Sequence, residues 1–291
     1  MLKTYEPSSI EEIANFLGAA TEPVVFDSSV PSHPFALPIK ASCLLSLKNY
    51  RGVIEHDVSD QVVVVRAGTL LSELQTELGK QGQCLPFAQL DPHQATATST
   101  FDTSLVDAIA FNLPHPLHRQ CGSWRDWIIG VRLVQSDGTI AKCGSKAVKN
   151  VAGYDVQRLM IGARNSLGLV AEVTFKTFPL KGLPNSGVQV SSDHLGKAPT
   201  WIQRVQPSDF ESAVQAGGRN LTAFDYASST LWATTRPNEG LKRFPGDWIL
   251  RSNAETKNLE FADPTVVRLI KRTKELFDPT NKLNPGAMGI V

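Results

Sequence analysis

A strand, a glycine turn and a helix follow one another directly between residues 61 and 78. Residues 61–66 contain four consecutive valines, and β-branched side chains favour an extended backbone. Ala67-Gly68-Thr69 then turns the chain, and Leu71, Leu74 and Leu78 recur at helical spacing. This succession predicts a fold that combines strands and helices around a shared core.

The N-terminal part begins with a predicted amphipathic helix over residues 10–17. Ser8 or Ser9 can cap its first turn, and Glu11 or Glu12 can complete a capping box. Its apolar residues recur on one face, as in a helix that packs against a core.

A β-hairpin is predicted farther along, from strands over residues 128–134 and 140–143. Asp137-Gly138 lies between them and is expected to supply the positive φ angles of a tight turn. Further strands are predicted over residues 23–26, 43–47 and 169–176.

The character of the chain changes after Pro179. Residues 181–187 resemble a linker, and the pattern stays weak to about residue 250. An amphipathic helix with a basic outer face is then predicted over residues 266–277, and Asp278-Pro279 ends it. We therefore expect three parts, at residues 1–180, 181–255 and 256–291.

Composition excludes several classes of function. The 29 Lys and Arg nearly balance the 28 Asp and Glu, so no long-range attraction to nucleic acid is expected. The four cysteines show no CxxC spacing, so no metal or iron–sulfur site is expected within this chain. The first residues lack the apolar core of a signal peptide, and no apolar stretch is long enough to span a bilayer. We expect a cytoplasmic protein.

Five segments, in this order and spacing, resemble the FAD-linked oxidases of the PCMH type, the vanillyl-alcohol-oxidase-like family. Among these, they are most similar to the FAD-binding E subunits of bacterial glycolate oxidases. The segments are 67–74 (Ala-Gly-Thr-Leu-Leu-Ser-Glu-Leu), 122–134 (starting Gly-Ser-Trp-Arg-Asp-Trp), 149–155 (Lys-Asn-Val-Ala-Gly-Tyr-Asp), 166–175 (starting Ser-Leu-Gly-Leu-Val) and the tail with Phe-Asp-Pro at 277–279 and Leu-Asn-Pro-Gly at 283–286. The resemblance implies an α+β fold with two α+β subdomains that clamp FAD, a reduced cap, and a C-terminal helix that returns to the flavin domain.

The FAD diphosphate is the group whose binding is hardest to explain in this chain. Backbone N–H groups converge on such oxygens, which favours glycine in the surrounding loops. The two loops that carry glycines in relatives carry none here, and each contains an acid, Asp27 or Asp102. A carboxylate about 5 Å from a phosphate costs on the order of a few kcal/mol. Hydroxyl donors could compensate, and the candidates are Ser28, Ser29, Thr96, Thr98 and Ser99.

The rest of the expected site follows from the resemblance. The flavin ring is expected near Gly122, Ser123 and the strand that starts at Gly168, where relatives use backbone groups. The candidates for cofactor binding are Gly122, Ser123, Asp126, Gly168, Val170 and Asn284. Asp155 could shape the flavin site, or it could be a helix N-cap or one partner of a buried ion pair. The sequence identifies no catalytic base.

Two functions remain open. In the first, FAD accepts a hydride from glycolate or another small 2-hydroxy acid, and electrons pass to partner subunits. The resemblance implies two partners, a larger flavin-containing glycolate oxidase subunit and an iron–sulfur subunit, which could hold the chain at the inner face of the membrane. In the second, the chain keeps the fold without the flavin and acts as a scaffold or assembly subunit of such a complex.

Overall fold

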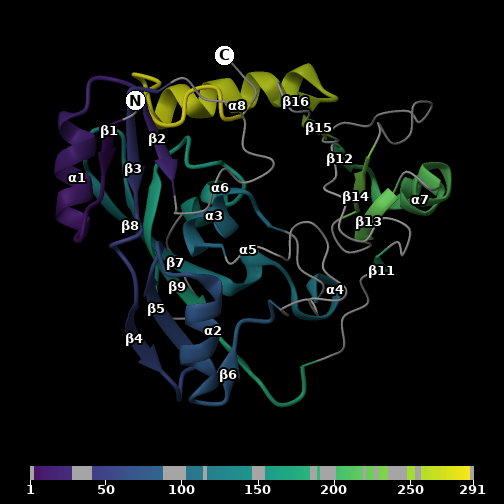
Figure 1. Ribbon diagram of the computed structural model, residues 1–291, viewed down its shortest axis with the longest axis horizontal. Coiled ribbons are helices and arrows are strands. Elements are labelled where there is room, and N and C mark those ends of the chain that lie inside the picture. The colour runs from purple at the N-terminus through teal and green to yellow at the C-terminus, as the bar shows by residue number, and fades with distance from the viewer. Residues whose placement is uncertain are drawn as a thin grey trace.

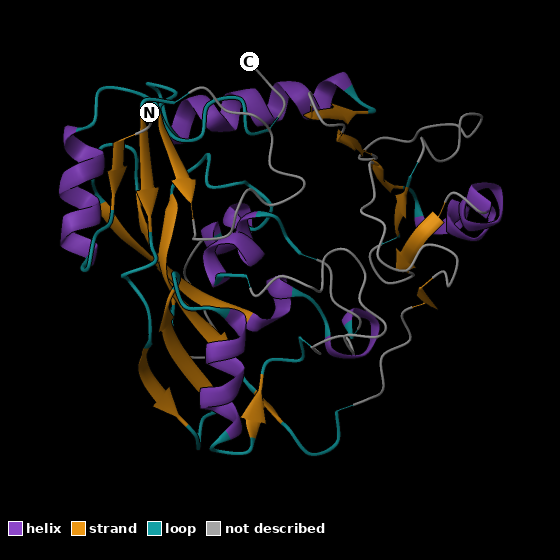
Figure 2. Ribbon diagram, in the orientation of Figure 1, coloured by secondary structure: helices purple, strands orange, loops and turns teal. Residues whose placement is uncertain are grey.

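The computed structural model describes residues 3–27, 41–87, 103–113, 117–145, 155–183, 189–190, 201–218, 221–225, 229–234, 248–252 and 257–288. Helices and strands alternate through the first two thirds of the chain, and strands dominate the part before the last helix (Figure 1, Figure 2).

A small parallel sheet forms the N-terminal subdomain. Its order is β1 (Lys3–Tyr5), β3 (Cys43–Ser46) and β2 (Val24–Asp27). Helix α1 (Ile10–Ala19) buries its apolar face in the core that it shares with this sheet, and its N-cap Ser9 accepts a hydrogen bond from the Glu12 N–H. The C-terminal tail extends the sheet, because Leu283 forms a parallel bridge with Val24 on β2.

A five-stranded antiparallel sheet forms the second subdomain. Its order is β4 (Val53–Asp57), β5 (Val62–Arg66), β9 (Leu169–Lys176), β7 (Ile128–Val134) and β8 (Ile140–Gly144). The other elements of this part of the chain are α2 (Leu71–Gly79), α3 (Leu105–Ala110), α4 (His118–Cys121), α5 (Trp124–Trp127), α6 (Val156–Met160), β6 (Gln83–Cys84) and β10 (Phe178–Pro179). All six residues of α3 are buried, so this short helix lies inside the subdomain rather than on its surface.

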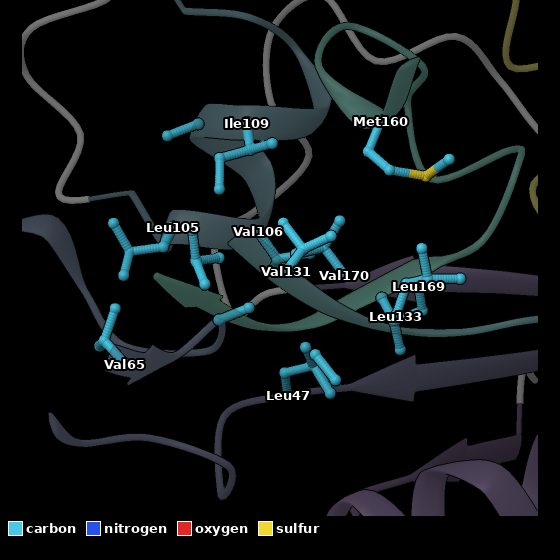
Figure 3. Packing of buried hydrophobic residues seen from close by; sticks show 14 of the residues in the cluster. Leu47, Val65, Leu105, Val106, Ile109, Val131, Leu133, Met160, Leu169 and Val170 are labelled. Carbon is cyan, nitrogen blue, oxygen red and sulfur yellow. The ribbon is translucent and has the colours of Figure 1, made fainter. Parts of the chain in front are cut away.

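One apolar core joins these two subdomains. Figure 3 shows Ile109 of α3 and Met160 of α6 above Val131 and Val170, with Leu47 of the first subdomain below the strands. Since residues from α1 through β10 and Leu283 all belong to this core, the two sheets and the tail are packed as one body.

The β7–β8 hairpin differs from the expected turn. Only Gly138 has a positive φ, of 86°, and Asp137 does not. The Gln135 N–H donates to the Thr139 carbonyl, and the Asp137 carboxylate accepts from the Thr139 N–H. Three residues lie inside that backbone hydrogen bond, so the expectation of positive φ at both central residues was wrong.

A third, antiparallel sheet lies away from the first two. Its order is β11 (Gln189–Val190), β13 (Leu221–Asp225), β14 (Thr230–Ala233), β12 (Trp201–Arg204), β15 (Trp248–Ser252) and β16 (Lys257–Phe261). Together with α7 (Phe210–Gly217) it has a core of its own. The boundary expected at residue 255 falls between β15 and β16, which are paired strands.

Helix α8 (Pro264–Phe277) runs from the third sheet back toward the first subdomain (Figure 1). The tail that follows is fixed by two lysines. Lys274 donates to the carbonyls of Ser166 and Leu283, and Lys282 donates to the carbonyls of Leu17 and Ala20. Among the described residues, no helix combines the length and apolar character that a membrane crossing requires.

Candidate functional site

Five of the expected cofactor-binding residues lie outside the described part of the chain. These are Ser28, Ser29, Thr96, Thr98 and Ser99. The chain is described up to Asp27 and again from Thr103, which are close to the ends of the two loops in question. The site is therefore built from the segments that adjoin those ends.

The loop before α5 contains Gly122, Ser123 and Asp126. The Asp126 carboxylate accepts hydrogen bonds from the Ser123 N–H, at 2.7 Å, and from the Ser123 hydroxyl, at 2.9 Å. Gly122 has a φ of 79°, and a Cβ there would lie 2.8 Å from the same carboxylate. The carboxylate thus caps α5 and fixes the loop, and the close approach requires glycine at position 122.

Gly168 and Val170 lie at the start of β9. The Val170 side chain is buried in the main core, opposite Leu133 of β7. The ladder between β5 and β9 ends at Arg66 opposite Glu172, with one more hydrogen bond from the Ala67 N–H to the Ala171 carbonyl. Val170 therefore contributes a side chain to the core, and its backbone lies beyond the end of β5.

The segments of Gly122 and Gly168 adjoin opposite ends of β7. The loop with Gly122 leads through α5 to Ile128, which pairs with Phe175, whereas Gly168 precedes Leu169, which pairs with Val134. The two ends of β7 that these segments adjoin are roughly 20 Å apart at 3.3 Å per residue. The two segments therefore adjoin opposite ends of the same central strand.

Asn284 connects three segments that are distant in sequence. Its side-chain oxygen accepts from the Phe26 N–H at 3.2 Å, and its amide nitrogen donates to the Arg164 carbonyl at 2.7 Å. Its own N–H donates to the Val24 carbonyl. Because β2 ends at Asp27, Asn284 lies beside the last residues before the first of the two glycine-free loops.

The segment between α6 and β9 carries a cation that the sequence did not single out. The Arg164 guanidinium lies 5.3 Å from the centre of the Phe111 ring, and Phe111 follows α3. Burial lowers the pKa of the Arg164 guanidinium to about 10, so it stays charged at neutral pH. The Arg164 N–H donates to the Ala110 carbonyl, which fixes this segment against the end of α3.

Helix α6 carries a buried side-chain amide whose oxygen lacks a hydrogen-bond partner in the described part of the chain. Gln157 is only 5% exposed, and its amide nitrogen donates to the Asp155 carboxylate at 3.1 Å. Its side-chain oxygen has no hydrogen-bond partner among the described residues. Asp155 itself is exposed and pairs with Arg158 at 3.4 Å, and its side chain makes no capping hydrogen bond to the α6 backbone.

These groups fit the chemistry of FAD. The cofactor carries two phosphate charges together with N–H and hydroxyl donors. Arg164 supplies a positive charge on a half-buried side chain, Asn284 fixes the segment that carries it beside β2, and Gln157 supplies a buried acceptor without a donor. Sequence patterns did not identify Arg164 or Gln157 as site residues, because their roles depend on burial and on contacts with distant segments.

Comparison with known proteins independently points to FAD as the cofactor. Residues 3–144 match the family described as FAD binding domain. The chain is 29% identical over 175 residues to "Glycolate oxidase subunit GlcE" of Escherichia coli, which covers 60% of this chain and 47% of that protein. It is 27% identical over 183 residues to a "D-lactate dehydrogenase" of Anaerostipes hadrus, covering 60% of this chain and 36% of that protein.

The match to "Glycolate oxidase subunit GlcD" of Bacillus subtilis is 28% identical over 142 residues, covering 49% of this chain and 28% of that protein. The matched part thus spans less than half the length of each of these relatives. A solved structure of alkyldihydroxyacetonephosphate synthase superposes with a TM-score of 0.55 at 12% identity, covering 97% of this chain and 75% of that one. This superposition confirms the expected α+β fold class.

Proposed function

Because this chain carries a PCMH-type FAD binding domain, we propose that it is the FAD-binding subunit of a 2-hydroxy-acid oxidoreductase complex of the glycolate oxidase kind. The structural observation that carries the proposal is the junction at Asn284, which ties Arg164 to the end of β2. This junction lies at the last residues of β2, directly before the segment where the resemblance implies contact with the diphosphate.

The Arg164 guanidinium would provide the positive charge that the glycine-free loops lack. A cation about 4 Å from one phosphate charge contributes about 4 kcal/mol at an effective dielectric of 20. A carboxylate at the same distance costs a similar amount. Arg164 would therefore offset one of the two acidic residues in these loops.

Different segments would hold different parts of the cofactor. The fixed loop at Gly122 and Ser123, capped by Asp126, would contact one end of the molecule through its backbone. The backbone at Gly168 and Val170 would contact the other end, beyond the last residues of β5. Ser28, Ser29, Thr96, Thr98, Ser99 and Asn284 would add polar donors near the diphosphate.

When bound, FAD supplies a hydride acceptor for a substrate such as glycolate or another small 2-hydroxy acid. The residues named above bind and orient the cofactor, and none of them is assigned a proton-transfer role. Electrons would leave through a larger flavin-containing subunit and an iron–sulfur subunit. Such a complex would lie in the cytoplasm or at the inner face of the membrane.

The second candidate is a flavin-free scaffold or assembly subunit of the same complex. It is favoured by the acids and the lack of glycine at residues 27–31 and 95–102. The two candidates differ in one measurable property, the affinity of the purified chain for FAD.

The visible spectrum of the purified protein, followed by an FAD titration monitored by flavin fluorescence, separates the two. A yellow protein, or saturable uptake of one FAD per chain, is the result expected for the flavin-binding subunit. A colourless protein that takes up no FAD would establish the scaffold instead. Arg164→Gln should weaken FAD binding at least tenfold, whereas Arg158→Gln, which removes an exposed guanidinium, should not.

A further inference from the structure

Gln157 is a buried polar residue whose side-chain amide forms a hydrogen bond through its nitrogen but, within the residues that the structure describes, not through its oxygen. The residue is 5% exposed and lies in the first turn of α6. Its nitrogen donates to Asp155, so turning the amide over would place its oxygen against a carboxylate that can only accept. The orientation of the amide is therefore fixed, and the unpartnered atom is the oxygen.

An orphaned acceptor of this kind has a substantial cost. Leaving a buried polar atom without a partner costs about 1–3 kcal/mol, and such atoms are uncommon in folded proteins. Two of the other described examples, on Gln203 and Trp232, belong to the separate six-stranded sheet. Gln157 is instead part of the segment that continues to Arg164 and Gly168.

The placement of α6 connects this acceptor with the candidate cofactor site. Met160 on the same helix packs into the core that also contains Ile109 of α3 (Figure 3). Two residues farther on, the Gly162 N–H donates to the Ile109 carbonyl, and the Arg164 N–H donates to the Ala110 carbonyl. The segment that follows the orphaned oxygen's helix, including the Arg164 backbone, is thus held against the same short helix.

We propose that the side-chain oxygen of Gln157 accepts a hydrogen bond from bound FAD. This inference rests on the proposed function and adds a residue to the flavin site. FAD offers N–H donors on its isoalloxazine and adenine rings and hydroxyl donors on its ribityl and ribose groups. A bond from any of these satisfies the buried oxygen, so the cost of the orphaned acceptor disappears when the cofactor binds.

The test compares Gln157→Met with Gln83→Met. Gln83 is a matched control, because it is 6% exposed and its side-chain oxygen accepts a hydrogen bond from the Thr177 hydroxyl. Two quantities are measured for each variant: the urea midpoint of the flavin-free protein, and the Kd for FAD from flavin fluorescence. For Gln157→Met we expect an unchanged or higher midpoint and a three- to tenfold larger Kd, which corresponds to about 0.7–1.4 kcal/mol.

For Gln83→Met the pattern is reversed: a lower midpoint and an unchanged Kd. The Kd values of riboflavin and ADP then show which half of FAD donates, since only the half that contacts Gln157 loses affinity in Gln157→Met. Equal FAD affinity in the wild type and Gln157→Met would overturn the inference alone. A lower midpoint for Gln157→Met would also overturn it, by showing a structural role. Failure of the wild type to bind FAD would overturn the proposed function together with it.

Discussion

The Tyr50–Glu172 hydrogen bond in the centre of the second subdomain offers a sharp test of the structure. Glu172 on β9 lies between Arg66 of β5 and Arg132 of β7, and it pairs with the Arg132 guanidinium at 3.0 Å. The Tyr50 hydroxyl donates to the same carboxylate oxygen at 2.7 Å, and Tyr50 is 3% exposed. Tyr50→Phe removes this donor and keeps the ring over which the Arg66 guanidinium lies.

The expected loss in the free energy of unfolding depends on the interactions that Glu172 keeps after the substitution. A hydrogen bond to a charged group contributes about 1.5–3 kcal/mol to stability. Because the Glu172 carboxylate keeps Arg132, it is not left unpaired, so the lower half of that range applies. We expect Tyr50→Phe to lower the free energy of unfolding by about 1.5–2 kcal/mol at neutral pH.

The difference in unfolding free energy between the wild type and Tyr50→Phe should also depend on pH in a defined direction. Burial, and then the hydrogen bond and charge of Glu172, raise the pKa of the Tyr50 phenol far above its usual value of about 10. Above pH 10 the unfolded chain can ionise this phenol while the folded chain cannot, so wild-type stability falls as the pH rises. Tyr50→Phe lacks this loss, and its stability difference from the wild type should shrink between pH 10 and pH 11.

Urea unfolding followed by tryptophan fluorescence measures both effects, since Trp124 and Trp127 are buried in the same core. Tyr5→Phe is the control, because the Tyr5 ring stacks on Phe16 at 4.5 Å and the substitution keeps that contact. A loss below about 0.5 kcal/mol for Tyr50→Phe, or a difference that stays constant up to pH 11, would refute this account of the cluster.

Three further predictions concern the tail and the candidate site. Lys282→Met removes an ammonium that donates to the carbonyls of Leu17 and Ala20, at 2.6 and 2.9 Å. This substitution should lower the free energy of unfolding by about 2–3 kcal/mol. An unchanged urea midpoint would contradict this expectation. Gly122→Ala forces a side chain into a left-handed backbone and against Asp126, and should cost about 1–2 kcal/mol in thermal unfolding, whereas Gly79→Ala, with open space at its Cβ, should cost nothing. Asn284→Ala breaks the bonds to Phe26 and Arg164 and should raise the Kd for FAD about tenfold; equal FAD affinity would show that the junction does not shape the site.

Local sequence signals were sufficient for much of the fold. The predicted strands over residues 128–134 and 169–176 coincide with β7 and β9, because each is a run of apolar and β-branched residues bounded by turns. Of the two capping choices for α1, Ser9 is the N-cap and the Glu12 side chain accepts from the Ser8 N–H. These features depend on residues a few positions apart, which sequence patterns capture well.

Features set by distant contacts were not predicted. Helix α3 has only six residues, all of them buried, so its sequence lacks the alternation of apolar and polar faces that predicts a helix. Strands β1 and β4 were also missed; each is short, and β1 pairs with a strand about 40 residues away. The partners of Asn284 lie 120 and 258 residues away in sequence, so no local pattern could reveal them.

The tail explains how the candidate site can rest on a backbone conformation that its residues do not favour. Arg164 and Asn165 both have positive φ angles, of 53° and 54°, and each such residue costs of the order of 1 kcal/mol. Asn284 donates to the Arg164 carbonyl and Lys274 donates to the Ser166 carbonyl, so hydrogen bonds from the tail and α8 bracket the unfavourable pair. At about 1 kcal/mol or more for each hydrogen bond, the two contributions are of the same size as the strain. The position of the Arg164 guanidinium is therefore a property of the docked C-terminal segment as much as of the loop itself, and the affinity for a diphosphate should follow the docking of that segment.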